Sequence, residues 1–193
     1  MNTNTERAEI RNASPVSRLP EAQVSHAVAV LCDAFHDYPV MRYVIGPAGG
    51  DYDRYLHTLV NFFVMARVWR GEPIFGVFDG SAPVAVATLT LPGKRQPPAE
   101  LAQLREVVWR ELGEPARMRY EAFGEVTQKF DIGQPHYHLN MIGVRRSHHG
   151  KGMSRQLLEA VHAMSQDDPA SRGEAQLETW GFFRPNKQGD KTW

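Results

Sequence analysis

The strongest chemical signal in the sequence is a basic turn with two glycines, between a predicted strand and a predicted helix. The strand ends at Val144, and the turn contains Gly150, Lys151 and Gly152. Residues without a Cβ atom let the main chain approach a ligand closely, and the first N–H groups of a helix have no intrahelical acceptor. Such N–H groups bind anions, above all phosphate, and the neighbouring arginines add positive charge. The turn therefore predicts a phosphate-binding site.

The spacing of these glycines excludes two common nucleotide-binding motifs. A Walker-type loop requires a glycine five residues before its Gly-Lys pair, and that position is Arg145. A dinucleotide fingerprint requires three glycines in the order G-x-G-x-x-G, whereas Gly150 and Gly152 are followed by Arg155. The phosphate ligand must therefore belong to another class.

The segment resembles the pyrophosphate-binding motif of the GNAT superfamily of acyl-CoA-dependent N-acyltransferases. That motif is Gln/Arg-x-x-Gly-x-Gly/Ala after a strand ending in an Ile-x-Val-like triplet. The resemblance covers residues 136–161, with His149 where Gln or Arg is usual and Ser154 where Gly or Ala is usual. It implies that acetyl-CoA, as co-substrate, is bound by Met141, Ile142, Gly143, Val144, His149, Gly150, Lys151, Gly152, Met153 and Ser154.

Two histidines on the same strand are candidates for catalysis. Strand alternation predicts one face with His136, His138 and Asn140, and an opposite face with Tyr137, Leu139 and Met141. An imidazole, with an ordinary pKa near 6.5, can take the proton of an arriving ammonium group. The resemblance implies that His138 is the base, because several GNAT enzymes carry acid–base residues there. Paired histidines like His136 and His138 occur on this strand in arylalkylamine acetyltransferases.

The same resemblance implies direct attack of an amine on the thioester, with main-chain N–H groups near Met141 and Ile142 stabilising the oxyanion. Other readings of the residues stay open. Both histidines could be structural, or could begin a metal site with His148 and His149. No metal is predicted, because no Cys or carboxylate lies at ligand-like spacing. A serine nucleophile has no Gly-x-Ser-x-Gly motif to support it.

The remaining pattern predicts the elements that position this site. Helices are expected from Pro20 to a break at residues 36–39, then over 51–69, 99–112 and 115–130, and after the glycine turn. Strands are expected over 74–78 and 82–91 around Asp79-Gly80, a strong hairpin signal, then before the turn and over 174–179. The second strand of the hairpin reads as a central strand covered on both faces.

These elements predict an α/β fold of GNAT type, with a mixed, mostly antiparallel sheet flanked by helices. Leu177-Glu178-Thr179 resembles the Leu-Glu-Thr of a family strand. The family continues with a tyrosine-bearing helix and closing strands, whereas this sequence predicts a shortened C-terminal part. We expect a flexible lead over residues 1–18 and a single acyltransferase domain over 19–193.

Composition narrows the class of protein. The 193 residues are 42% hydrophobic and carry 22 basic and 22 acidic side chains, which predicts a globular protein that binds neither nucleic acid nor anionic membrane. The single cysteine, Cys32, excludes an intrachain disulfide and fits a buried thiol in a reducing compartment. With no apolar run of about 18 residues and no apolar leader, a cytoplasmic location is expected.

The expected function is acetyl-CoA-dependent N-acetylation of a small-molecule amine. The alternative is a non-catalytic or truncated acyl-CoA-binding protein of the same fold. The acceptor stays open among an aminoglycoside, an arylalkylamine, a polyamine and a protein terminus. An open sheet edge after Thr179 would let a second copy pair there and form a homodimer.

Overall fold

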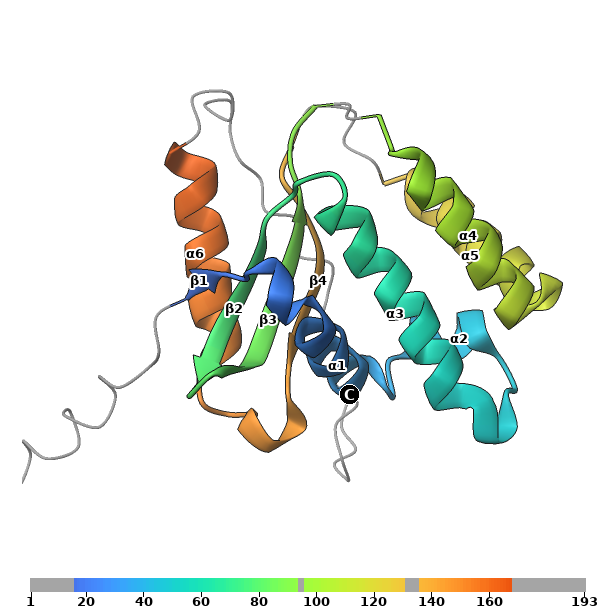
Figure 1. Cartoon of the computed structure of the whole chain (residues 1–193), viewed down its shortest axis with the longest axis horizontal. Coiled ribbons are helices and arrows are strands. Elements are labelled where there is room, and N and C mark those ends of the chain that lie inside the picture. Colours follow the sequence, from blue (N-terminus) through green and yellow to red (C-terminus); the bar gives the residue numbers. More distant parts are fainter. Residues whose placement is uncertain (1–15, 94–95, 131–135, 168–193) are drawn as a thin grey trace, which may run out of the picture.

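A four-stranded antiparallel sheet forms the centre of the molecule in the computed structural model, which describes residues 16–93, 96–130 and 136–167 (Figure 1). Its strands, in spatial order, are β1 (Ser17–Arg18), β2 (Ile74–Asp79), β3 (Ala82–Thr90) and β4 (His138–Val144). Gly80, at a φ of 60°, turns the chain between β2 and β3, as the hairpin signal predicts. Every residue from Val84 to Leu89 is buried, because helices cover both faces of β3. The predicted central strand is confirmed.

Helices lie on both faces of this sheet (Figure 1). On one face lie α1 (Val24–Phe35) and α3 (Tyr52–Val68), and on the other lies α6 (Met153–Asp167). The hairpin of α4 (Ala99–Leu112) and α5 (Glu114–Gln128) packs outside α3. On the α6 side, Leu157 and Val161 are fully buried, and at a spacing of four residues they share the helix face that packs on the sheet.

The chain between α1 and α3 differs from the prediction. Tyr38 is extended before Pro39 and α1 has ended, as expected, but the same proline opens a further helix, α2 (Pro39–Ile45). Proline fits the first helical turn, where its missing N–H is not needed. Likewise, Pro20 does not begin α1 directly. It precedes a short 3-10 helix, Glu21–Gln23, that leads into α1.

The predicted face assignment on β4 is wrong in one respect. Thr88 pairs with Met141 and Leu89 pairs with Leu139, so Asn140 is an extra residue without a partner on β3. This β-bulge interrupts the alternation of side chains. Leu139 therefore packs into the core under α6, whereas Met141 joins the core under α1 and α3. The two residues were predicted on one face.

Parts of the predicted architecture lie outside the described residues. These parts are most of the 1–18 lead, the strand over 174–179 and the shortened C-terminal part. Ser17 and Arg18 pair with β2 as the edge strand β1. No helix in the described part of the chain is long and apolar enough to cross a membrane.

Close packing of α1 on β4 generates a first prediction, at Gly143. A Cβ atom added at Gly143 would lie 2.8 Å from the Cβ of Ala34 and 3.1 Å from a methyl carbon of Leu31. Gly143→Ala should lower the free energy of unfolding by about 1–3 kcal/mol, because helix and strand must separate. The measurement is urea denaturation.

Gly124→Ala is the matched control, because a Cβ atom there meets nothing within 4 Å in the middle of α5. It should raise stability by about 0.5–1 kcal/mol through helix propensity. Equal stability of Gly143→Ala and the unsubstituted chain would contradict the tight contact.

Candidate functional site

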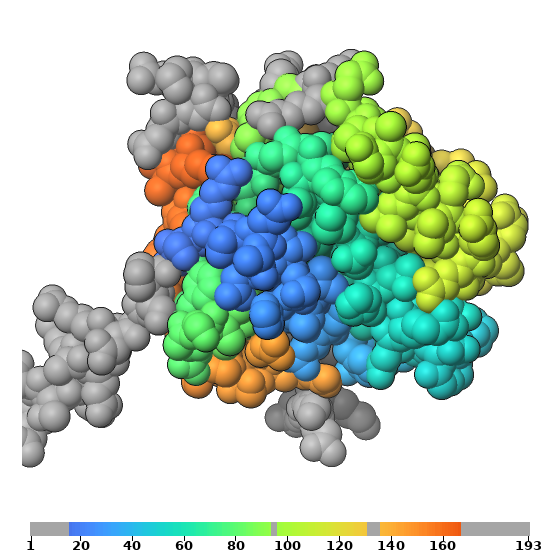
Figure 2. Space-filling model, in the orientation of Figure 1, coloured from blue at the N-terminus to red at the C-terminus, as the bar shows by residue number. Residues whose placement is uncertain are grey.

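The glycine turn leaves β4, passes through a 3-10 helix at Arg146–His148 and enters α6 at Met153. Gly150 and Gly152 have φ angles of 81° and 76°, in the left-handed region that glycine tolerates best. A Cβ atom built at either position meets no atom within 4 Å. Figure 2 shows this segment at the surface of the molecule. Among the residues that the structure describes, no side chain therefore occludes the bend.

Main-chain N–H groups at the start of α6 are available to a ligand. The first intrahelical hydrogen bond runs from the N–H of Gln156 to the carbonyl of Gly152, at 3.2 Å. The N–H groups of Met153, Ser154 and Arg155 precede it and have no intrahelical acceptor. Lys151 and Arg155 are exposed and take part in no salt bridge within the described ranges. Within the described residues, these amides and cations together offer hydrogen-bond donors and positive charge of the kind that suits an anion.

Two carboxylates from distant parts of the chain anchor the turn. Asp33 on α1 accepts hydrogen bonds from the main-chain N–H of Arg146, at 2.8 Å, and from its guanidinium Nε, at 2.9 Å. Asp79, at the end of β2, lies 3.2 Å from Nε2 of His148. The turn is therefore held against both α1 and the β2–β3 hairpin. The sequence pattern marks Asp79 as a hairpin residue, but nothing in it indicates that either aspartate contacts the glycine turn.

The pKa of Asp33 reflects this anchoring. Partial burial raises the pKa, but hydrogen bonds from the main chain and side chain of Arg146, with its charge, outweigh burial and lower it. A carboxylate with a lowered pKa in the folded chain stabilises the fold above its ordinary pKa of about 4. That stabilisation is lost as pH falls through the lowered value.

The edge of β4 offers a second set of main-chain groups. The N–H of Arg145 donates to the carbonyl of Val84. Antiparallel alternation therefore directs the main-chain N–H and C=O groups of Met141 and Gly143 toward β3. The N–H and C=O groups of Ile142 and Val144 then point to the opposite edge. No described strand pairs there. One of these groups is engaged, since Nε2 of His149 donates to the carbonyl of Val144 at 3.0 Å.

The predicted cofactor residues therefore occupy different environments. Gly143 is buried under α1, and Met153 packs into the core under α6. The exposed His149 turns back onto β4, where its ring holds the turn by a hydrogen bond to the carbonyl of Val144. The exposed members of the set are His149, Gly150, Lys151, Gly152 and Ser154.

The two candidate catalytic histidines lie at the other end of β4. Their ring centroids are 6.0 Å apart, with an interplanar angle of 71°. His138 is exposed and pairs across the ladder with Thr90. Across the described ranges, no three His, Cys, Asp or Glu side chains gather in a group that could hold a metal ion.

Sequence reasoning missed a polar cluster beside these histidines. Arg67 on α3 donates from Nε to Oδ1 of Asn140 at 2.9 Å, and from a terminal nitrogen to Oγ1 of Thr90 at 3.2 Å. Thr90 also donates to Oδ1 of Asn140, at 3.0 Å. Arg67 is 73 positions from Asn140, and its place in a helical pattern gave no signal of this contact.

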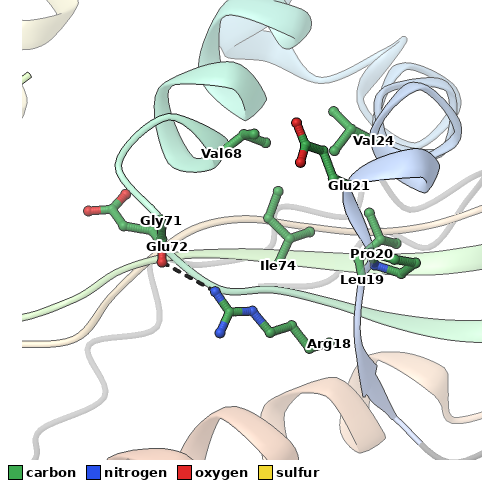
Figure 3. Close-up of a pocket in the computed structure, with 9 residues that line it drawn as sticks. All are labelled: Arg18, Leu19, Pro20, Glu21, Val24, Val68, Gly71, Glu72 and Ile74. Atoms are coloured by element: carbon green, nitrogen blue, oxygen red, sulfur yellow. Dashed lines mark hydrogen bonds between the residues drawn. The ribbon is translucent and has the colours of Figure 1, made fainter. Parts of the chain in front are cut away.

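A hollow of about 380 Å³ lies at the β1 edge of the sheet, away from the β4 edge and the glycine turn (Figure 3). It is bounded by β1, the start of α1, the end of α3 and the start of β2. Arg18 donates to the carbonyl of Gly71 at 3.3 Å on one side of it. Apolar Val24, Val68 and Ile74 face it, and none of its lining residues is a histidine, serine or cysteine. This hollow is separate from the glycine turn.

Comparison with known proteins supports the fold. The structure is similar to the crystal structure of a Corynebacterium glutamicum protein described as histone acetyltransferase HPA2 and related acetyltransferase. The TM-score is 0.58 at 20% sequence identity, over 81% of this chain and 74% of that chain. No protein-family model matches the sequence, and no curated protein matches it. The similarity confirms the predicted GNAT-like α/β fold, a sheet flanked by helices.

The Asp33 anchor generates a prediction about pH. Asp33→Asn should lower the free energy of unfolding by about 1–2 kcal/mol at pH 7, because the amide is uncharged and offers only one acceptor oxygen to Arg146. The deficit should begin to shrink as pH falls below about 4, where the carboxylate of the unfolded chain takes up a proton, and should vanish once pH falls below the lowered pKa of the folded chain. Chemical denaturation between pH 7 and pH 3 measures it.

Asp51→Asn is the control, because the Asp51–Arg54 pair is also an aspartate–arginine pair, at 3.0 Å, with both side chains more than half exposed. Its effect should stay under about 0.5 kcal/mol. A deficit of Asp33→Asn that is unchanged from pH 7 to pH 3 would contradict the ion pair with Arg146.

Proposed function

We propose that this chain is an acetyl-CoA-dependent N-acetyltransferase that transfers the acetyl group to the amine of a small molecule. One observation carries the proposal: the glycine turn, with N–H groups at the start of α6 that have no intrahelical acceptor, continues directly from an edge of β4 on which no described strand pairs. A diphosphate with an extended amide-containing arm matches both features. Coenzyme A has this chemistry.

In this proposal the turn holds the diphosphate. The N–H groups of Met153, Ser154 and Arg155 donate to its oxygens, and Lys151 neutralises charge. The arm of the cofactor then runs along β4, where the outward carbonyl of Ile142 and the outward N–H of Val144 pair with its amides as a neighbouring strand would. The resemblance in fold to an acetyltransferase supports this assignment.

The reaction proposed is direct transfer. His138 takes a proton from the incoming ammonium group, and the neutral amine attacks the thioester carbonyl. An outward N–H of β4, that of Ile142, stabilises the negative charge on the carbonyl oxygen. The new C–N bond forms, the nitrogen gives up its second proton to solvent, the C–S bond breaks, and the departing thiolate takes a proton from solvent. The products are the N-acetyl amine and free coenzyme A.

Gly152→Glu tests the diphosphate site. The substitution adds a side chain and a negative charge to an open, left-handed position, and acetyl-CoA affinity should fall at least about 100-fold, measured by calorimetry. Gly49→Glu is the control. Gly49 also has a positive φ, of 54°, with no atom within 4 Å, but it lies before α3. Equal affinities of the two variants would contradict the site, and absence of binding by the unsubstituted chain would refute the proposed function.

His138→Ala tests the base and separates an enzyme from a protein that only binds acyl-CoA. Release of free thiol with a panel of amines should detect turnover by the unsubstituted chain. Loss of His138 should lower kcat by about 10²–10⁴-fold and flatten the pH–rate profile near neutrality. His26→Ala is the control, because His26 is an exposed histidine on α1. An unaltered profile would exclude His138 as the base. Binding without thiol release would favour the non-catalytic alternative.

A further inference from the structure

The β-bulge at Asn140 separates two parts of β4 that have different roles in the proposed function. The side chain of Arg67 contacts this bulge. Asn140 is the extra residue of the bulge. On its C-terminal side lies Ile142, whose outward groups are proposed to meet the thioester. On its N-terminal side lies His138, the proposed base. The geometry of the bulge therefore sets the position of one half relative to the other.

Arg67 is hydrogen-bonded to the bulge itself and to the residue that faces the proposed base across the ladder. Its Nε donates to Asn140, and a terminal nitrogen donates to Thr90, the residue that pairs with His138. In an antiparallel ladder such a directly opposite pair shares one face of the sheet, with Cβ atoms about 4.5–5.5 Å apart. Through Thr90, the guanidinium therefore acts on the neighbour of the proposed base as well as on the bulge.

The environment of Arg67 keeps it in this orientation. The other terminal nitrogen donates to the carbonyl of Phe63, one turn earlier on α3, at 3.2 Å. Oε2 of the buried Glu72 lies 3.8 Å from Nε. The Arg67 side chain is only 14% exposed, and burial lowers its pKa against the opposing effect of Glu72. A planar group with hydrogen bonds from all three nitrogens has little freedom to rotate.

We propose that Arg67 is a positioning residue. It fixes Asn140 in the bulge and Thr90 beside His138, so that the thioester-binding edge of β4 and the base keep one relative geometry. This inference rests on the proposed function and goes beyond it, because it assigns a catalytic consequence to a side chain on α3 outside the turn and the strand.

Three variants test the role. Arg67→Lys keeps the charge and loses the three-nitrogen fork, and Asn140→Leu removes the acceptor at similar volume. Both should lower kcat about 10–100-fold and change the KM for acetyl-CoA by less than about 3-fold, since misplacement affects the transition state more than diphosphate binding. Asn140→Asp keeps an acceptor oxygen and should retain kcat within about 3-fold. If Arg67→Lys does not fold, the two Asn140 variants still decide the question.

Arg117→Lys is the matched control, because Arg117 forms an exposed pair with Glu121 on α5, at 2.9 Å. It should leave both kinetic constants unchanged. Amide hydrogen exchange gives a readout that needs no ligand: Arg67→Lys and Asn140→Leu should speed exchange over residues 138–142 and leave the start of α6 unchanged.

The outcomes separate the two proposals. If the unsubstituted chain neither binds acetyl-CoA nor releases thiol, the proposed function is refuted, and the positioning role with it. If the unsubstituted chain turns over while Asn140→Leu keeps kcat and native exchange, only the positioning role is refuted. A fall in kcat and a rise in KM of equal size would also refute it, because that would indicate general loss of cofactor binding.

Discussion

The close approach of α1 to β4 is the contact on which the site depends. It requires glycine at position 143, where a Cβ atom would overlap Ala34. Once α1 lies this close, Asp33 on the same helix reaches Arg146, just beyond the end of β4. The main-chain hydrogen bond fixes the direction in which the chain leaves the strand. A packing constraint in the core thus determines the orientation of an exposed turn.

The two ends of β4 differ in their main-chain geometry. Toward the C-terminal end, the chain leaves the ladder, turns through two left-handed glycines and begins α6 with free N–H groups. Toward the N-terminal end, the bulge at Asn140 interrupts the ladder under Arg67. A regular strand between two loops would offer neither feature. In the proposed function, this asymmetry gives the elongated cofactor a direction, with its diphosphate at the turn.

Local sequence patterns predicted much of this structure. The Asp79-Gly80 hairpin, the helix over 99–112 and the helix after the glycine turn follow from turn chemistry and apolar spacing, which act within a few residues. The helix α2 was missed because Tyr38-Pro39 signals both the end of one helix and the start of another. The bulge was missed because alternation assumes an unbroken ladder, and nothing near Asn140 marks an insertion.

Of the candidate site, the residues of the glycine turn could be predicted. The side chains that hold the turn and the bulge in place could not. Asp33 and Arg146 are 113 positions apart, and Arg67 and Asn140 are 73 apart, so each pairing exists only after the helices have packed on the sheet. An aspartate or arginine on a helix normally indicates a solvated face. Only the folded arrangement shows that these two side chains are turned toward β4.

The two supports differ in what they contribute. The ion pair of Asp33 with Arg146 is partly exposed and is joined by a hydrogen bond from the main-chain N–H of Arg146. It therefore fixes the direction of the chain after β4, and forming it removes little charged surface from water. Arg67 is largely buried, with Glu72 as a buried counterion. Removing a guanidinium from water costs free energy that such a pair recovers only in part, and replacing both partners by apolar side chains of similar volume would often give equal stability. What an apolar side chain would not provide is the directed hydrogen bonds to Asn140 and Thr90. The effect of Arg67 is therefore on orientation at the bulge more than on the stability of the fold, which is why kinetic constants and local exchange, rather than melting temperature, report its role.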